Sequence, residues 1–282
     1  MNVWVEGIGI WGPGMTSWAD CRACLTGATE ADGQYGEPPA TALSAQERRR
    51  STASVRIAAE IAAQACAAAG RDAAEYATVS ASSTGDLATA DAICRTLAID
   101  ARLLSPTRFH NSVHNAPAGY WSIVSGCQQA ANALAAGAAS FAAGLLEAVV
   151  QCTVEARPVM LLAYDLPGPS PLAEVCGIAA GFGVALAFTP APATGAPMLQ
   201  IRYDGAGAEE TVLDNPQLEA LRLATPGARC LPLLAVVAKG TDGSVKLAME
   251  AGSLAVAVAG ADDDARKHNA ASRHHCSSDS RS

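Results

Sequence analysis

Apolar positions along the first 190 residues follow two alternating patterns. Short apolar runs are typical of strands, and longer stretches with apolar residues three and four apart are typical of helices. Strands that alternate with helices predict an α/β fold, in which helices are layered on a sheet. The predicted strands are 3–11, 76–81, 159–164 and 179–188, and the predicted helices are 16–25, 53–69, 86–97 and 116–123.

The pattern weakens after Pro190. Four short apolar runs still predict strands, and one stretch predicts a helix. The strands are 198–203, 231–238, 245–249 and 254–258, and the helix is 217–223. From Asp262 the chain is polar and charged, which predicts a disordered tail over 262–282. We therefore expect one domain over 1–190, a shorter extension over 191–261 that packs on it, and the tail.

One segment joins the two patterns without a turn between them. A small-residue run over 133–137 passes directly into a helical pattern that includes Phe141. A strand that runs straight into a helix forms an elbow, whose first helical residue faces unpaired N–H groups and the positive end of the helix dipole. Enzymes place Cys or Ser there, because this field favours the thiolate or alkoxide. Here the elbow carries Gly137, Ala138 and Ala139, so it predicts the framework of a nucleophile site without the nucleophile.

Composition and charge narrow the class of protein. Half of the 282 residues are hydrophobic and 16% are charged, which is typical of a folded chain. The formal net charge of −8 disfavours a nucleic-acid partner. We also expect no membrane span and no signal peptide, since no long apolar run and no basic leader is evident. Nine cysteines at irregular spacings are typical of reduced residues, so we expect a cytoplasmic protein.

Several motifs before the elbow resemble the N-terminal half of the β-ketoacyl synthases, which have the thiolase-like fold. They are Ser105-Pro106, Asn115-Ala116-Pro117-Ala118-Gly119, Ser122-Ile123 and Gly126, in the order of the family. When the family's Thr-Ala-Cys-x-Ser-Gly elbow is laid beside the chain without a gap, Ala138 falls on the acyl-accepting Cys and Ser140 on the Ser. The opening strand and the segment 177–188 are also similar to the family.

The resemblance ends before the second half of the family. Its catalytic histidines lie there in His-Gly-Thr-Gly-Thr and Asn-Ser-Phe-Gly motifs, and this sequence contains neither motif. The chain is thus most similar to the chain-length factors, which pair with an active ketosynthase and lack its nucleophile, and in particular to the short ones of aryl-polyene biosynthesis. This resemblance implies a thiolase-like α/β fold with a truncated second half and no catalysis by the chain alone. It also implies a heterodimer with a catalytic β-ketoacyl synthase, and contact with an acyl carrier protein through that complex.

In family dimers, the segment that corresponds to 115–121 lies at the two-fold interface and reaches toward the acyl tunnel of the partner. The resemblance therefore implies a set of interface or tunnel residues whose bulk limits product length. They are Asn115, Ala116, Pro117, Tyr120, Trp121 and, in the elbow helix, Phe141. The alternative is a helix that packs in the dimer without influence on length.

Other residues offer rival chemistry. Cys127 is a second candidate nucleophile, with His114 as its base, which would make the protein a cysteine-dependent acyltransferase or hydrolase. The resemblance places Cys127 before the strand rather than at the elbow, and free cysteines are commonly small buried hydrophobic residues. A homodimeric scaffold without a ketosynthase partner is the remaining alternative.

We expect neither a metal nor a cofactor. His110 and His114 have no third ligand at a metal-binding spacing, so hydrogen bonds to the loop backbone are the expectation. The pair Cys21 and Cys24 has redox spacing without a second pair, which favours packing. Gly7-Ile8-Gly9 lacks the rest of a dinucleotide fingerprint, so we expect no dinucleotide cofactor there. Glu47-Arg48-Arg49-Arg50 is expected to be a solvated helix start, and docking of an acidic carrier protein is the alternative.

Overall fold

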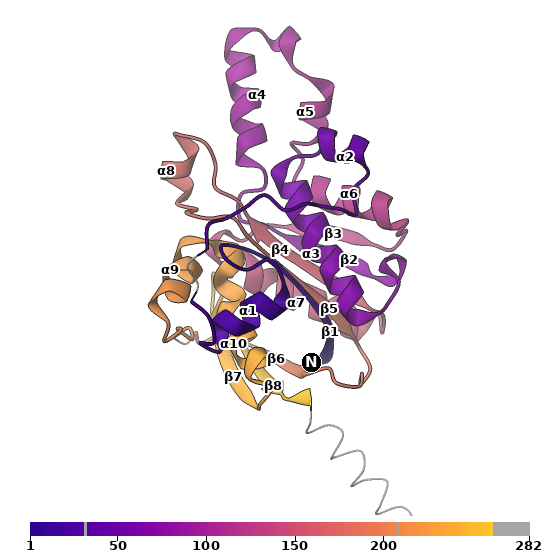
Figure 1. Cartoon of the computed structure of the whole chain (residues 1–282), viewed down its shortest axis with the longest axis vertical. Coiled ribbons are helices and arrows are strands. Elements are labelled where there is room, and N and C mark those ends of the chain that lie inside the picture. Colours follow the sequence, from indigo (N-terminus) through magenta and orange to yellow (C-terminus); the bar gives the residue numbers. More distant parts are fainter. Residues whose placement is uncertain (31–32, 208, 262–282) are drawn as a thin grey trace, which may run out of the picture.

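An eight-stranded sheet with the strand order β3-β2-β4-β5-β1-β6-β8-β7 forms the centre of the computed structural model (Figure 1). The structure describes residues 1–30, 33–207 and 209–261, so the predicted tail lies outside the described residues. Strand β2 is parallel to β3 and β4, and the remaining neighbours are antiparallel. The strands are β1 (Asn2–Trp11), β2 (Ala77–Ala81), β3 (Ala131–Leu134), β4 (Val159–Asp165), β5 (Phe182–Thr189), β6 (Met198–Asp204), β7 (Gly243–Ala248) and β8 (Ser253–Ala259).

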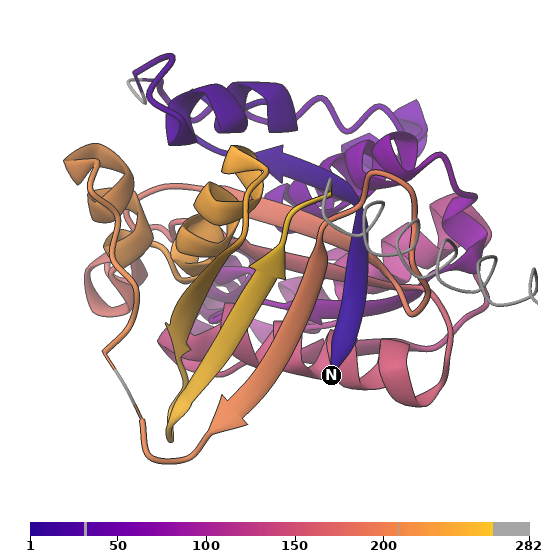
Figure 2. The same cartoon turned by 90° about the horizontal axis from the view of Figure 1, so that it is seen from below.

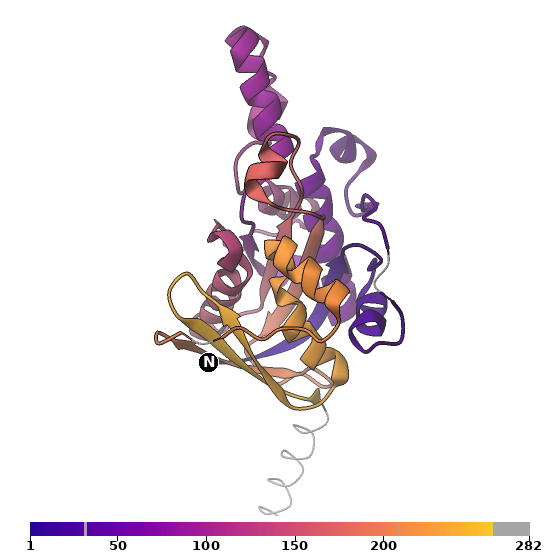
Figure 3. The same ribbon diagram turned by 90° about the vertical axis from the view of Figure 1, so that its left-hand side faces the viewer.

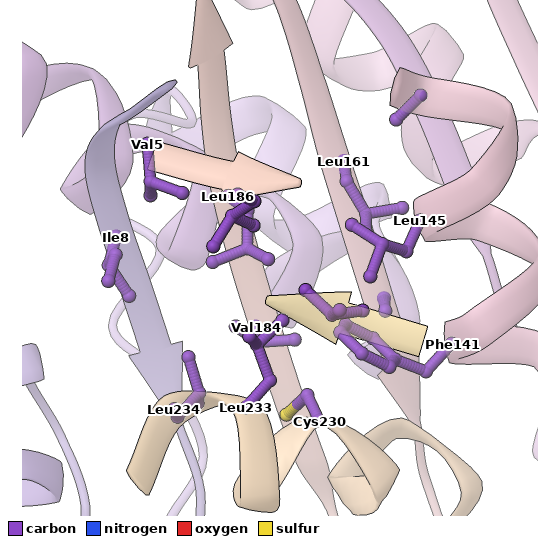
Figure 4. Close-up of a cluster of buried hydrophobic side chains, with 14 of the residues drawn as sticks. Val5, Ile8, Phe141, Leu145, Leu161, Val184, Leu186, Cys230, Leu233 and Leu234 are labelled. Atoms are coloured by element: carbon purple, nitrogen blue, oxygen red, sulfur yellow. The ribbon is translucent and has the colours of Figure 1, made fainter. Parts of the chain in front are cut away.

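Helices cover both faces of the sheet over β1, β4 and β5, and each face has its own apolar cluster. Helices α3 and α6 pack on one face, and α7 and α10 pack on the other. On the face covered by α7 and α10, the apolar cluster joins α7 to the strands through Phe141, Leu145 and Leu161 (Figure 4). The helices are α1 (Trp18–Leu25), α2 (Ala45–Arg50), α3 (Ala53–Ala69), α4 (Leu87–Ile99), α5 (Pro106–His110), α6 (Ala116–Ser125), α7 (Ser140–Val154), α8 (Leu172–Cys176), α9 (Pro216–Ala224) and α10 (Leu231–Lys239).

The glycines of β1 serve close packing of this strand on α3. A Cβ atom added to Gly9 would lie 1.9 Å from the carbonyl oxygen of Ile61, and one added to Gly7 would lie 2.1 Å from that of Ala65. Only a residue without a side chain lets the strand backbone come so near the helix backbone. The Gly7-Ile8-Gly9 motif is therefore explained by helix-to-strand packing.

The predicted α/β class is confirmed, and most predicted elements lie within a few residues of the observed ones. The predicted strand 231–238 is wrong, because these residues form α10, with Pro232 in its first turn and the left-handed Gly240 at its C-cap. Helix α5 (Pro106–His110) was not among the predicted helices. The segment 191–261 continues the same sheet, because β6 pairs antiparallel with β1.

Among the described residues, one helix has the length and composition of a membrane span. Contrary to our reading of the sequence, Gly137–Val154 is long and apolar enough by length and mean hydropathy, 1.4. This stretch contains α7, whose side chains Phe141, Leu145 and Val149 are buried in the cluster beneath the sheet. Core helices of globular proteins pass the same test, so the result is weak evidence for a membrane.

Candidate functional site

The elbow between β3 and α7 is a strand, a tight turn and a helix. Strand β3 ends at Leu134, residues Gly137–Ala139 form a single 3₁₀ turn, and α7 begins at Ser140. Gly137 has φ +52°, a left-handed conformation that side chains disfavour. The predicted direct passage from strand to helix is thus interrupted by a turn, which places Ala138 at the exposed apex.

Ser140 holds this turn in place. Its buried Oγ donates to the carbonyl oxygen of Gly137 at 2.8 Å and accepts from the backbone N–H of Ala136 at 2.9 Å. Both bonds span the turn, so one hydroxyl fixes the backbone on either side of Ala138. The family-matching serine therefore has a structural role that needs no neighbouring nucleophile.

A cavity of about 460 Å³ lies beside the elbow. Apolar and small side chains of the elbow form one wall, while Glu210, Arg229 and the end of β7 form the other. The lining residues include no cysteine, serine or histidine; they are Ala136, Gly137, Ala138, Ala139, Phe141, Ala142, Glu210, Arg229, Leu247, Ala248, Met249 and Glu250. This cavity therefore has the size of a small-molecule site, while its lining provides neither a thiol nor an imidazole.

The charged wall of the cavity is an ion-pair network. The carboxylate of Glu210 forms ion pairs with the guanidinium groups of Arg229, at 2.7 Å, and Arg222, at 2.8 Å. Arg222 forms a second ion pair with Glu219 at 2.6 Å. Hydrogen bonds from Arg222 lower the pKa of Glu219. Because Arg222 is buried, losing one carboxylate would leave an incompletely paired guanidinium, which explains why the charges occur together.

The rival nucleophile Cys127 lies at the opposite end of the parallel strands. Its Sγ donates to the carbonyl oxygen of Tyr76, just before β2, at 3.1 Å. His114 Nε2 donates to the carbonyl oxygen of Leu134, at the end of β3, at 3.0 Å. Leu134 pairs with Ala81, so at about 3.3 Å per strand residue the two contacts lie about 16 Å apart. The structure does not bring Cys127 and His114 together.

The predicted interface and tunnel residues of α6 divide into exposed and buried ones. Asn115 is exposed and Tyr120 is half-buried, whereas Ala116, Pro117 and Trp121 are buried. Phe141 is wholly buried in the core and also lines the elbow cavity.

A hollow of about 430 Å³ lies between α2 and α6. It is lined by Asn115, Ala116 and Tyr120 together with Arg50 and His110. The Tyr120 hydroxyl donates to Asn111 Oδ1 at 3.1 Å, and its ring meets that of His110 edge to face at 6.3 Å. Helix α2 is capped at its start by Ser44, and the hydrogen bonds from Ser44 lower the pKa of Glu47. The expectation that Glu47–Arg50 start a helix is wrong for the arginines, because Arg48, Arg49 and Arg50 form the last turn of this short helix.

One exposed apolar surface does not follow from the predicted elements. We call residues 87–110, which comprise α4, α5 and their connection, the apolar arm; it projects beyond the sheet (Figures 1 and 3). Thr89 is the only buried residue of α4, while Ile99 is 80% exposed, Leu103 64% and Phe109 60%. The sequence of α4 is rich in apolar residues, which predicts that the helix is buried. The described part of this chain does not bury it.

The remaining candidates contribute packing. Cys21 and Cys24 are buried in the cluster beneath the sheet, and burial raises the pKa of the Cys21 thiol well above its usual value. Within the described residues, no group of three or more His, Cys, Asp or Glu side chains is placed to hold a metal ion.

A mixed sheet with helices on both faces, and an elbow at the end of a parallel strand, defines the thiolase-like fold of the ketosynthase N-terminal half. The chain belongs to the family described as β-ketoacyl synthase, N-terminal domain, whose model matches residues 18–251. No curated protein is similar enough in sequence to count as a match.

Solved ketosynthase structures share this fold at low sequence identity. The complex of the ketosynthase ApeO with its chain length factor ApeC from Xenorhabdus doucetiae matches with 18% identity, 92% coverage of this chain, 99% of that chain and a TM-score of 0.68. The ishigamide ketosynthase/chain length factor matches with 13% identity, the same two coverages of 92% and 99%, and a TM-score of 0.64. The AntDE:AntF complex, an acyl-carrier protein with its type II polyketide ketosynthase, matches with 8% identity, 92% and 99% coverage, and a TM-score of 0.71.

Proposed function

We propose that this chain is a non-catalytic partner of a β-ketoacyl synthase, of the chain-length-factor type. The partner supplies the cysteine, the histidines and the condensation chemistry. This chain supplies interface area and part of the wall around the growing acyl chain. We place the complex in the cytoplasm and its product in the polyketide or fatty-acid class, with aryl polyenes as the specific candidate.

The composition of the elbow cavity carries the proposal. Acyl transfer through a covalent intermediate needs a nucleophile and a base within hydrogen-bond reach. The cavity has Ala138 at the apex and the Glu210–Arg229 pair opposite, so neither group is present. The Cys127 alternative finds no support, since this thiol bonds a carbonyl at the far end of the strands.

The apolar arm supports a protein partner. Several of its large apolar side chains are exposed to water, and groups of exposed apolar side chains are typical of protein interfaces. Ile123 on α6 is 71% exposed and lines the same hollow as His110 of the arm. Within this interface, Tyr120 and Asn115 line the hollow beside α2, where they are proposed to limit the length of the acyl chain.

Co-expression with a candidate ketosynthase tests the proposal. We expect the two chains to copurify as a heterodimer, and the product lengths of the synthase to change when this chain is present. Isolation of a stable homodimer that leaves both the synthase and its products unaffected would contradict the proposal and favour a scaffold.

A matched pair of leucines controls for folding. Leu97 in the apolar arm is 49% exposed and Leu223 in α9 is 55% exposed, and each lies near the end of its helix. We expect Leu97→Glu to abolish copurification and Leu223→Glu to leave it intact. Equal effects of the two variants would exclude the arm as the interface.

A further inference from the structure

A trough crosses the outer face of the strands that follow residue 190. Its floor is Ala255 and Ala257 on the central strand β8, and longer side chains rise from β6 and β7 on either side. The volume of this hollow is about 540 Å³. We call the six residues that shape it the sheet trough; they are Gln200, Arg202, Ser244, Lys246, Ala255 and Ala257.

Strand register places the two charges of the trough in one row. Arg202 on β6 and Lys246 on β7 both pair with Ala255, so the guanidinium and the ammonium flank one alanine. The opposite face of these strands is apolar and buried against α10 and α7. Arg202 and Lys246 are exposed, and Figure 2 shows this face of the three strands open.

The trough is cationic although the whole chain is acidic. The chain carries a formal net charge of −8, yet no carboxylate lines the hollow. Among the described residues, neither Arg202 nor Lys246 forms an ion pair. The nearest acid along β6 is Asp204, whose Oδ1 accepts from the backbone N–H of Ala206. The two cations are therefore available to external carboxylates.

Shape and charge together select the occupant. From β6 to β7 the trough spans two strand spacings, about 10 Å. An α-helix, about 10–12 Å across with its side chains, can therefore rest over the floor with one flank beside each cation. A second copy of this chain would oppose like charges across a two-fold axis, which is unfavourable. A helix with a small-residue ridge and carboxylates on both flanks satisfies the alanine floor and both cations.

We propose that the sheet trough docks an acidic helix of a partner protein, and that this partner is the acyl carrier protein of the complex. This inference rests on the proposed function, which brings an acidic carrier protein to the same assembly. The trough lies on β6, β7 and β8, at the end of the molecule away from the apolar arm, so both surfaces can be occupied together (Figures 1 and 3). Electrostatic docking there raises the local concentration of the carrier near the synthase.

Titration of an apo acyl carrier protein tests the trough, with this chain measured both alone and in its ketosynthase complex. We expect Arg202→Glu combined with Lys246→Glu to weaken binding at least tenfold at low salt. Ala255→Leu, which fills the floor without a change of charge, should weaken it at least fivefold. Lys239→Glu is the control, because this exposed lysine ends α10 on the covered side of the sheet.

The outcomes separate this inference from the proposed function. Unchanged carrier affinity in the trough variants, or equal losses with Lys239→Glu, overturns the trough as the docking site. The absence of carrier binding to the unmodified chain overturns it as well. Failure to pair with any ketosynthase overturns the proposed function, while the titration of the chain alone still decides the trough. Unchanged melting temperatures of the variants show that any loss of binding is not a loss of fold.

Discussion

Removal of the Ser140 hydroxyl tests how the elbow is held without a catalytic group. Ser140→Ala deletes both bonds across the turn and leaves the N–H of Ala136 without its partner. Loss of a buried hydrogen bond that strands one partner costs about 1–3 kcal/mol, and we take about 2 kcal/mol for this partly buried turn. For a chain of this size that loss lowers the melting temperature by roughly 4–8 °C.

Urea and thermal unfolding measure this effect directly. Ser122→Ala is the matched control, since Ser122 Oγ makes one bond, at 2.9 Å, to a carbonyl of its own helix. We expect less than about 0.5 kcal/mol from the control, as is usual for substitutions away from a buried network. Equal losses in the two variants would refute the role of Ser140 as the residue that fixes the elbow.

Three other substitutions probe the fold around the site. Burial raises the pKa of Asp165, so the folded state disfavours the charged carboxylate. The stability that the protonated Asp165 contributes is therefore present at low pH and is lost as pH rises above about 4. Asp165→Asn should therefore gain stability relative to the unmodified protein as pH rises above about 4 in denaturant titrations, and a constant difference would contradict this. Gly9→Ala should destabilise the fold by about 3 kcal/mol, because the new Cβ meets the Ile61 carbonyl at 1.9 Å, whereas Gly119→Ala, with open space around it, should not; similar unfolding curves would disprove the close contact. Phe141→Ala should cost about 3–5 kcal/mol through the cavity it leaves in the core, and a loss below 1 kcal/mol in calorimetry would argue against its burial.

Local sequence patterns predicted the first part of the fold well, because it is built from strongly periodic segments. The helix 53–69 was placed at its observed bounds, and buried strands such as β4 read as continuous apolar runs. The run 231–238 was misread because a short apolar stretch has no period that separates a buried helix from a strand. Its proline and the following glycine carried the missing signal.

The site was predicted in part. The elbow and its alanine follow from local sequence, whereas its opposite wall does not, because Glu210 and Arg229 are distant in sequence and are brought there by the fold. The sheet trough was equally hidden, since it depends on the register of three strands. The apolar sequence of α4 predicts that the helix is buried, but it does not tell whether this chain or a partner covers it. Only the structure shows that α4 is exposed in this chain.

The central claim is that acyl groups are not attached to this chain. Intact-protein mass spectrometry of the complex with a catalytic ketosynthase, after incubation with an acyl thioester, measures this on both chains at once. We predict an acyl adduct on the ketosynthase and an unchanged mass for this chain. A stoichiometric adduct on this chain, at Cys127 or at any other residue, would contradict the account.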